Sequence, residues 1–128
     1  MSILLKKIVP ATLFILFINS AGAADSILMK PYPVLYSYFE DFLQRADKMD
    51  SASAFSALDE IAALAEKKRD HQLKYKTQLV RFTLLRRKGG LKDGEAYLFK
   101  LLPAVEKYKL NALNAEVLHT LANYQWGL

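Results

Sequence analysis

The sequence has 128 residues, of which 24% are charged, and its formal net charge is +5 at pH 7. This length corresponds to one small domain with a modest hydrophobic core. The absence of cysteine excludes disulfide bonds, thiolate chemistry and the lipid-modified cysteine of bacterial lipoproteins. The net charge is too low to indicate a polyanionic partner. Helix packing or a neighbouring repeat must therefore hold the domain together.

The N-terminal segment, residues 1–24, has the three-part pattern of a secretory signal peptide. Lys6 and Lys7 form a basic start, residues 8–18 are mostly apolar, and small residues follow at positions 21–24. The apolar run is well short of the roughly 20 residues that a membrane-spanning helix needs. The pattern therefore predicts a cleaved signal peptide.

Cleavage of this segment exports the rest of the chain. We expect the cut near Ala23 or Ala24, which leaves residues 25–128 as one periplasmic or secreted domain. Its formal charge falls from +5 to +3, because two lysines leave and no acidic residue does. The alternative is that the segment stays uncleaved, which would give the domain its only contact with a membrane.

Apolar residues recur at the three-and-four spacing of α-helices along the exported part, and no strand-like alternation is sustained. We therefore expect an all-α fold of about five helices. The first begins near Pro33, since proline suits the first helical turn. The second spans about 54–69, with candidate N-caps at 50–53. The third spans about 71–88, with Asp70 as its cap.

The last two helices follow a glycine pair at 89–90, which ends the third helix. Asp93 begins the fourth helix. Pro103 falls inside it and predicts a kink or a broken turn, because proline removes a backbone donor and crowds the preceding turn. Asn111 is the expected cap of the fifth helix, which reaches Trp126.

Two stretches forty residues apart are similar: residues 64–73 read LAEKKRDHQL, and residues 104–113 read AVEKYKLNAL. At a shift of 40 the second and fourth helices align their apolar positions. The third and fifth align better at 39, pairing Leu79 with Leu118 and Phe82 with Leu121. A period near 40 for a pair of antiparallel helices is typical of a helical solenoid. The alternative is a chance likeness between amphipathic helices with similar ends.

The order A-E-K-K-x-D-x-x-L, followed by L-L-P-A-V-E-K-Y-K-L and A-E-V-L-H-T-L-A-N-Y, resembles degenerate tetratricopeptide repeats. More narrowly, residues 53–126 are similar to the exported repeat domains that precede transmembrane and signalling segments in bacterial sensor kinases and regulators. The resemblance implies antiparallel hairpins stacked as a short solenoid. Such solenoids usually continue through further repeats, so we expect either a chain truncated at its C-terminus or another molecule covering that end.

No arrangement of side chains in the sequence indicates catalysis or metal binding. His71 and His119 lack a second ligand at metal-binding spacing. The adjacent acidic residues at 40–41 and 59–60 point about 100° apart on a helix, so they do not converge as an acid–base pair. Residues 89–92 lack the preceding strand and the spacing of a phosphate loop. We therefore expect a non-enzymatic protein with no metal or cofactor.

The expected function is a scaffold for protein–protein interaction, with a protein or peptide partner and no nucleic acid. Its concave face would consist mainly of the third and fifth helices, where polar residues lie between apolar ones. The candidate contact residues are Tyr75, Gln78, Arg81 and Arg86 on the third helix and Asn114, His119, Asn123 and Gln125 on the fifth. An alternative is a small periplasmic bundle that holds an apolar ligand among its many aromatic side chains.

Overall fold

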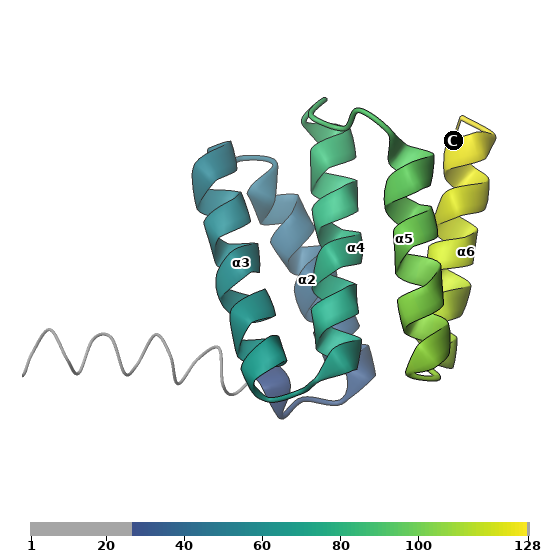
Figure 1. The fold of residues 1–128 in the computed structure, drawn as a ribbon. Helices are drawn as coiled ribbons and strands as arrows, with labels where there is room; N and C mark the ends of the chain where they lie inside the picture. The colour runs from purple at the N-terminus through teal and green to yellow at the C-terminus, as the bar shows by residue number, and fades with distance from the viewer. Residues whose placement is uncertain (1–26, 128) are drawn as a thin grey trace, which may run out of the picture.

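The computed structural model describes residues 27–127, and this part of the chain contains five α-helices and no strand. The helices are α2 (Tyr32–Ala46), α3 (Ser51–Lys67), α4 (His71–Arg87), α5 (Gly94–Lys107) and α6 (Asn111–Gln125), as Figure 1 shows. The predicted all-α class is confirmed. The signal peptide expected at residues 1–24 lies outside the described residues. None of the described helices combines the length and apolar character that a membrane crossing requires.

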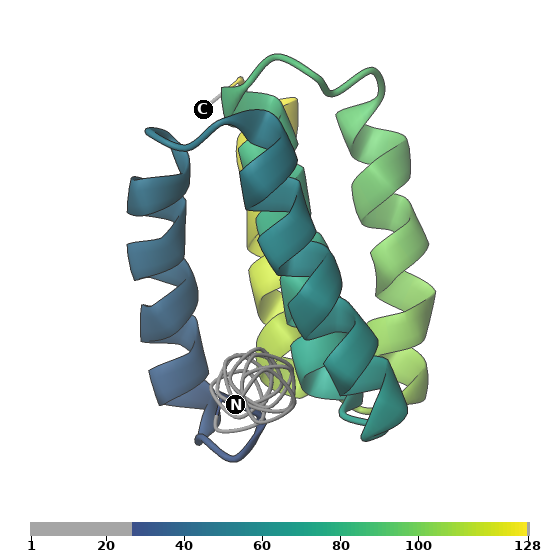
Figure 2. The same ribbon diagram turned by 90° about the vertical axis from the view of Figure 1, so that its left-hand side faces the viewer.

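Helix α4 lies at the centre of the fold. It packs against α3 in one antiparallel hairpin, and α5 and α6 form a second hairpin beside it (Figure 1). Helix α2 also packs against α4. Figure 2 shows α2 and α5 on opposite sides of the molecule, with the other helices between them. Helix α4 is therefore the element that joins the two halves.

Two hydrophobic cores lie on either side of α4. The first core consists of Leu35, Phe39, Phe42, Leu43 and Ala46 of α2, Ala54, Leu58, Ile61 and Ala65 of α3, and Leu73, Val80 and Leu84 of α4. The second core consists of Leu79 and Phe82 of α4, Leu98, Leu101 and Val105 of α5, and Leu113, Val117 and Leu121 of α6. Because α4 buries residues in both, its apolar positions surround the helix instead of forming one stripe.

The two similar stretches, 64–73 and 104–113, form the same turn. The backbone angle φ is positive in both, at 55° for Arg69 and 54° for Lys109. In each turn the next residue donates its N–H to the carbonyl five residues before it, over 2.9 Å. These are the features of a Schellman motif, which ends a helix by satisfying its last carbonyls. The similarity in sequence therefore reflects one local structure that is used twice.

Aspartates cap three of the helices. Asp50, Asp70 and Asp93 accept a hydrogen bond from the N–H three residues later, at 2.8, 3.0 and 2.9 Å respectively. The predicted cap at Asn111 is wrong, because Leu110 is the N-cap and Asn111 is the first helical residue. Since the turns are equivalent at a shift of 40, Leu110 takes the place of Asp70 and offers no side-chain acceptor.

Two further expectations about the last helices need correction. Of the kink or broken turn expected at Pro103, the broken turn is wrong, because α5 runs unbroken through this residue, which is exposed and displaces no core residue. The alignment of α4 with α6 at a shift of 39 is also wrong, because Leu79 is buried whereas Leu118 is 48% exposed. A shift of 40 pairs buried residues instead. These pairs are Leu73 with Leu113 and Thr77 with Val117.

Candidate functional site

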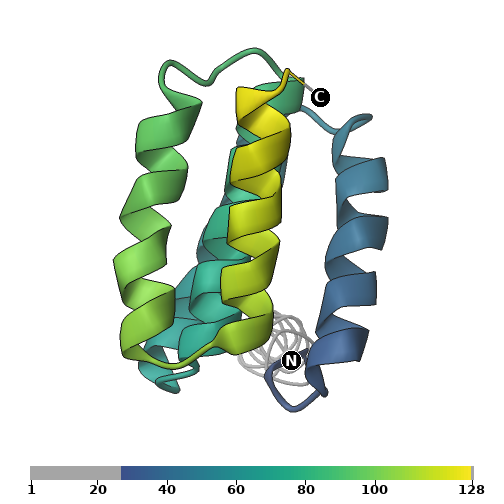
Figure 3. The same cartoon turned by 90° about the vertical axis from the view of Figure 1, so that its right-hand side faces the viewer.

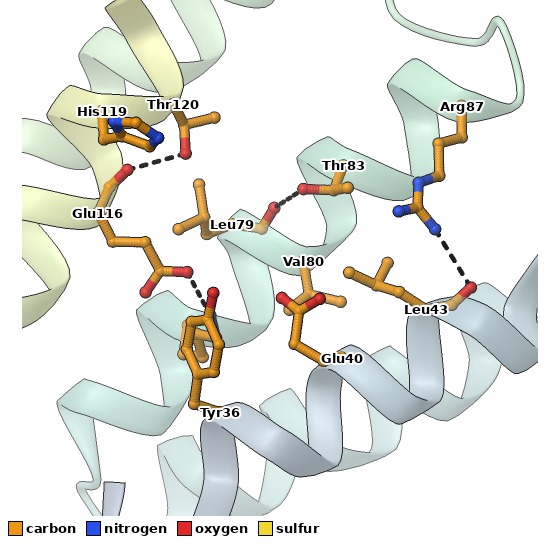
Figure 4. A pocket seen from close by; sticks show the side chains of 11 residues that line it. Tyr36, Glu40, Leu43, Leu79, Val80, Thr83, Arg87, Glu116, His119 and Thr120 are labelled. Atoms are coloured by element: carbon orange, nitrogen blue, oxygen red, sulfur yellow. Dashed lines mark hydrogen bonds and ion pairs between the residues drawn. The ribbon is translucent and has the colours of Figure 1, made fainter. Parts of the chain in front are cut away.

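A pocket of about 180 Å³ lies between α2 and α6, and α4 forms its floor. Figure 3 shows α6 in front of α4 with α2 to the right, and Figure 4 shows the side chains that line the pocket. We call this site the α2–α6 groove. Its lining residues are Tyr36, Glu40 and Leu43 of α2, Lys76, Leu79, Val80, Thr83 and Arg87 of α4, and Glu116, His119 and Thr120 of α6.

The three helices line the groove with the same positions, forty residues apart. Tyr36, Lys76 and Glu116 occupy one equivalent position. Four residues later come Glu40, Val80 and Thr120, and Leu43 and Thr83 follow three residues after that. The spacing i, i+4, i+7 places side chains on one face of a helix. Each helix therefore turns an equivalent face toward the groove.

The floor and walls of the groove combine apolar and hydroxyl groups. Leu43, Leu79 and Val80 provide apolar surface. Thr83 donates its hydroxyl to the carbonyl of Leu79 at 3.2 Å, and Thr120 donates in the same way to the carbonyl of Glu116 at 2.8 Å. Both hydroxyl oxygens keep lone pairs that can accept a hydrogen bond from a ligand.

One end of the groove is closed by four side chains that we call the Lys76–Glu116 cluster: Tyr32, Tyr36, Lys76 and Glu116. Lys76 is only 2% exposed, and its ammonium group pairs with Oε1 of Glu116. The hydroxyl of Tyr32 donates to Oε2 of Glu116 at 2.7 Å. The Lys76 ammonium lies 4.1 Å from the centre of the Tyr36 ring, within range of a cation–π contact. The cluster thus links α2, α4 and α6.

Burial keeps the two tyrosines of this cluster protonated. The pKa of Tyr32 is raised far above its ordinary range, first by burial and then by its hydrogen bond to the Glu116 carboxylate. Burial also raises the pKa of Tyr36, with help from the nearby carboxylates of Glu40 and Glu116. Both phenols therefore remain hydrogen-bond donors to a higher pH than an ordinary tyrosine does.

The other end of the groove is closed by Arg87. Its guanidinium donates to Oδ2 of Asp47 at 3.1 Å and to the carbonyl of Leu43 at 3.5 Å. On the α6 side, the ring of His119 is hydrogen-bonded to Asn123 at 3.0 Å. Glu40 and His119 thus provide a carboxylate and an imidazole on opposite walls (Figure 4).

Two of the eight predicted contact residues lie at this groove. His119 lines it, and Asn123 is bonded to His119. Gln125 is exposed at the end of α6. The side-chain oxygen of Asn114 is buried and has no hydrogen-bond partner among the described residues. Of the four residues predicted on α6, only His119 therefore lines the groove.

The four residues predicted on α4 lie at contacts with other helices. Arg81 pairs with Asp59 of α3 and lies over the Phe55 ring. The carbonyl of Gln78 accepts from the Tyr97 hydroxyl at 2.9 Å, on the α5 side. Tyr75 packs against the second core, and Arg86 lies over the Tyr124 ring. The structure therefore places these four residues at helix–helix contacts and not in the groove.

Sequence reasoning missed the whole contribution of α2, together with Lys76 and Glu116. Lysine is almost never fully buried unless it is paired, and no local pattern in the sequence singles out Lys76. One signal for their pairing was present in the sequence, because Lys76 and Glu116 carry opposite charges and lie forty residues apart, like the two similar turns. Residues of opposite charge at that spacing can pair between neighbouring helices.

Within residues 27–127, no group of three histidine, aspartate or glutamate side chains lies close enough together to hold a metal ion. Comparisons of the chain with known protein families, with curated proteins and with solved structures find no match.

Proposed function

We propose that the protein is an exported, non-enzymatic scaffold that binds a short segment of a partner protein in the α2–α6 groove. The observation that carries this proposal is the equivalent lining of the groove by three helices forty residues apart. Repeat proteins build their binding surfaces in this way, since each unit adds the same face to one continuous concavity. On this reading α2, α4 and α6 are the second helices of successive units in a short tetratricopeptide-like solenoid, the outer part of a signalling protein.

The chemistry of the groove favours a peptide over an apolar small molecule. Its volume of about 180 Å³ suits one or two side chains, whereas pockets for drug-sized ligands hold roughly 300–1,000 Å³. An apolar side chain of the partner would lie over Leu79 and Val80. The partner's backbone groups would meet the hydroxyl oxygens of Thr83 and Thr120 and the polar groups of Glu40 and His119.

A displayed peptide library selected on residues 25–128 tests this proposal. We expect the selected peptides to shift the amide NMR signals of α2, α4 and α6 around the groove. We also expect Thr83→Phe to weaken their binding at least about tenfold, because the ring fills the pocket while the helix keeps its core residues. The binding constants are measured by isothermal titration calorimetry.

The matched control is Ser56→Phe, which adds the same ring at an exposed position of α3 outside the groove. This variant should bind the peptides as the parent chain does. Peptides whose signals map elsewhere, or that bind equally well to the Thr83→Phe variant, would show that the groove is not the binding site.

Export is proposed from the sequence alone and has a separate test. When the full chain is produced in a bacterium that secretes proteins, the mass of the product should correspond to a start at Ala24 or Asp25. A product that keeps its first residues would contradict cleavage.

A further inference from the structure

The outward side of α6 carries no charged residue. Glu116 is the only charged residue among the 15 of this helix, and it points inward to Lys76 and Tyr32. The exposed positions Asn111, Ala115, Leu118, Ala122 and Gln125 form a line that we call the α6 stripe. Leu118 is 48% exposed, and Trp126, just beyond the helix, is 82% exposed. A surface helix without outward charge is unusual in a chain that is 24% charged, and depletion of charge is a mark of interface cores.

The three central positions of the stripe, Ala115, Leu118 and Ala122, are covered on the two equivalent helices. At shifts of 40 and 80 residues, they correspond to residues that pack against the hairpin that follows. These are Leu35, Tyr38 and Phe42 in the first core, and Tyr75, Gln78 and Phe82 at the contact with α5. On α6 the stripe residues are exposed, so the described part of the chain leaves them uncovered. Figure 3 shows α6 at the front of the molecule. The stripe is thus a continuation of two helix–helix interfaces already present in the fold.

The side chains of the stripe differ from their counterparts in size. The positions equivalent to Ala115 and Ala122 are occupied by leucine, tyrosine or phenylalanine on α2 and α4. Large residues keep the next helix at a distance, whereas alanine lets two helices approach closely. The stripe therefore suits a helix in closer contact than the one that α5 makes with α4.

The pattern of the stripe is complementary to itself. Leu118 is the middle residue of α6 (Asn111–Gln125), with the two alanines and then the two amides on either side. Two antiparallel copies of α6 about a two-fold axis would place Leu118 against Leu118. Ala115 would meet Ala122, and Asn111 would meet Gln125. The 4-3-4-3 spacing is that of a coiled-coil seam, and side-chain amides can donate to and accept from each other.

We propose that a second copy of this chain covers the α6 stripe, through an antiparallel, two-fold pairing of the two α6 helices. Self-complementarity is what such an isologous interface requires. The net positive charge of the chain opposes association elsewhere on its surface, whereas no charged residue meets another across this stripe. The groove lies on another side of α6, so the dimer would present two open grooves.

This interface is small, because a 15-residue helix is about 22 Å long. Interfaces of this size belong to weak or transient complexes, and we expect dissociation in the micromolar range. Sedimentation equilibrium of residues 25–128 from about 5 to 500 µM covers that range. The weight-average mass should rise from one chain toward two as the concentration increases.

Leu118→Glu should keep the protein monomeric throughout this range, since it places two like charges on the two-fold axis. The matched control is Phe99→Glu, the same change at a residue of α5 that is 49% exposed, and it should dimerise like the parent chain. A parent chain that stays monomeric, or dimerises equally well with Leu118→Glu, overturns the proposal. So does a mass that exceeds two chains, because a two-fold pairing closes on itself.

Disulfide trapping provides a test that does not depend on the charged variant's folding. The chain has no cysteine, so Leu118→Cys introduces a single thiol close to its copy across the axis. Under mild oxidation this variant should form a covalent dimer at least about tenfold faster than Phe99→Cys. Ala115→Cys should cross-link to itself slowly, because its copies lie apart in an antiparallel pair. Equal rates for Leu118→Cys and Phe99→Cys, or fast self-linking of Ala115→Cys, would refute the arrangement.

Discussion

The ammonium group of Lys76 is the residue-scale feature on which the groove depends. It is almost completely removed from water, and its charge is balanced by Glu116 and by the face of the Tyr36 ring. A buried ion pair stabilises the folded state little more than a well-packed apolar pair does. Removing one of its partners, however, leaves a buried charge without compensation. Both oxygens of Glu116 are already used, one by Lys76 and one by Tyr32. The cluster therefore sets the relative position of three helices.

We predict that Glu116→Gln lowers the free energy of unfolding by about 2–3 kcal/mol, because Lys76 is left without a counter-charge. Lys76→Met should cost less, since Glu116 is partly exposed and keeps its bond from Tyr32. Urea unfolding of both variants and of the double variant gives the coupling energy, which should exceed about 1 kcal/mol. Additive effects of the two changes would contradict the pairing.

Tyr32 gives the protein a dependence on alkaline pH. In the unfolded chain its hydroxyl titrates near its ordinary pKa of 10.0, whereas in the folded protein the pKa is higher. Above pH 10 the folded state therefore binds more protons than the unfolded state, and the stabilising contribution falls as pH rises. Below that pH the contribution is fully present.

We predict that Tyr32→Phe makes the decline in stability above about pH 10 shallower. At neutral pH the same variant should be about 1 kcal/mol less stable, because its hydrogen bond to Glu116 is lost. Urea unfolding of the parent and the variant between neutral and alkaline pH measures both effects. An unchanged alkaline slope would show that Tyr32 titrates normally in the folded protein.

At the scale of elements, the two Schellman turns are sites where the chain accepts strain. Arg69 and Lys109 have positive φ, a region that residues with a Cβ adopt at a cost and that glycine adopts freely. By contrast, Gly89 and Gly127 supply glycine at positive φ in this chain. The turns are thus not optimised for stability.

We predict that Arg69→Gly and Lys109→Gly each raise the free energy of unfolding by about 0.5–1 kcal/mol. The two gains should add, because the turns belong to different hairpins. Glu60→Gly is the control: it replaces an exposed residue in the middle of α3, where glycine should destabilise. Thermal and urea unfolding measure all of these changes, and a loss of stability in the first two variants would contradict the assigned turn geometry.

Elements were predictable from the sequence where local chemistry determines them. Asp50, Asp70 and Asp93 mark helix starts because their side chains cap helices with no help from the rest of the fold. The same reasoning failed at Asn111, because position in the repeated turn outweighed capping propensity. Local signals therefore predict the helices but miss the start of α6, which the preceding turn determines.

The groove was less predictable, because the positions that line it at forty-residue spacing carry different types of residue. Tyr36, Lys76 and Glu116 have no chemistry in common, so an alignment of apolar residues finds the period in the two hairpins and misses it in α2. The contact between Tyr32 and Glu116 joins residues 84 positions apart. No local pattern indicates such a contact, which depends on the packing of all three helices.

At the scale of the whole molecule, α4 couples the two cores. Leu73, Val80 and Leu84 lie in the first core, and Leu79 and Phe82 lie in the second. Unfolding of either half uncovers one side of α4 and removes its support for the other half. We therefore expect the two halves to unfold together in one transition.

We predict that Leu84→Ala, a change confined to the first core, lowers the protection of backbone amides in α5 and α6 as well as in α2 and α3. The expected loss is about 2–4 kcal/mol, which is typical for a leucine that is fully buried. Hydrogen exchange followed by mass spectrometry measures the protection helix by helix. Unchanged protection of α5 and α6 would mean that the halves unfold independently.

The 84-residue span of the Tyr32–Glu116 hydrogen bond also bears on the order of folding. The hairpins close through neighbouring segments and short loops, whereas this bond closes a loop that includes most of the domain and carries the largest entropic cost. The hairpins should therefore form first, and α2 should dock last. Unfolding follows these steps in the opposite order, so detachment of α2 is the easiest partial opening of the native protein. A partner bound in the groove would slow that opening by bridging α2 to α6.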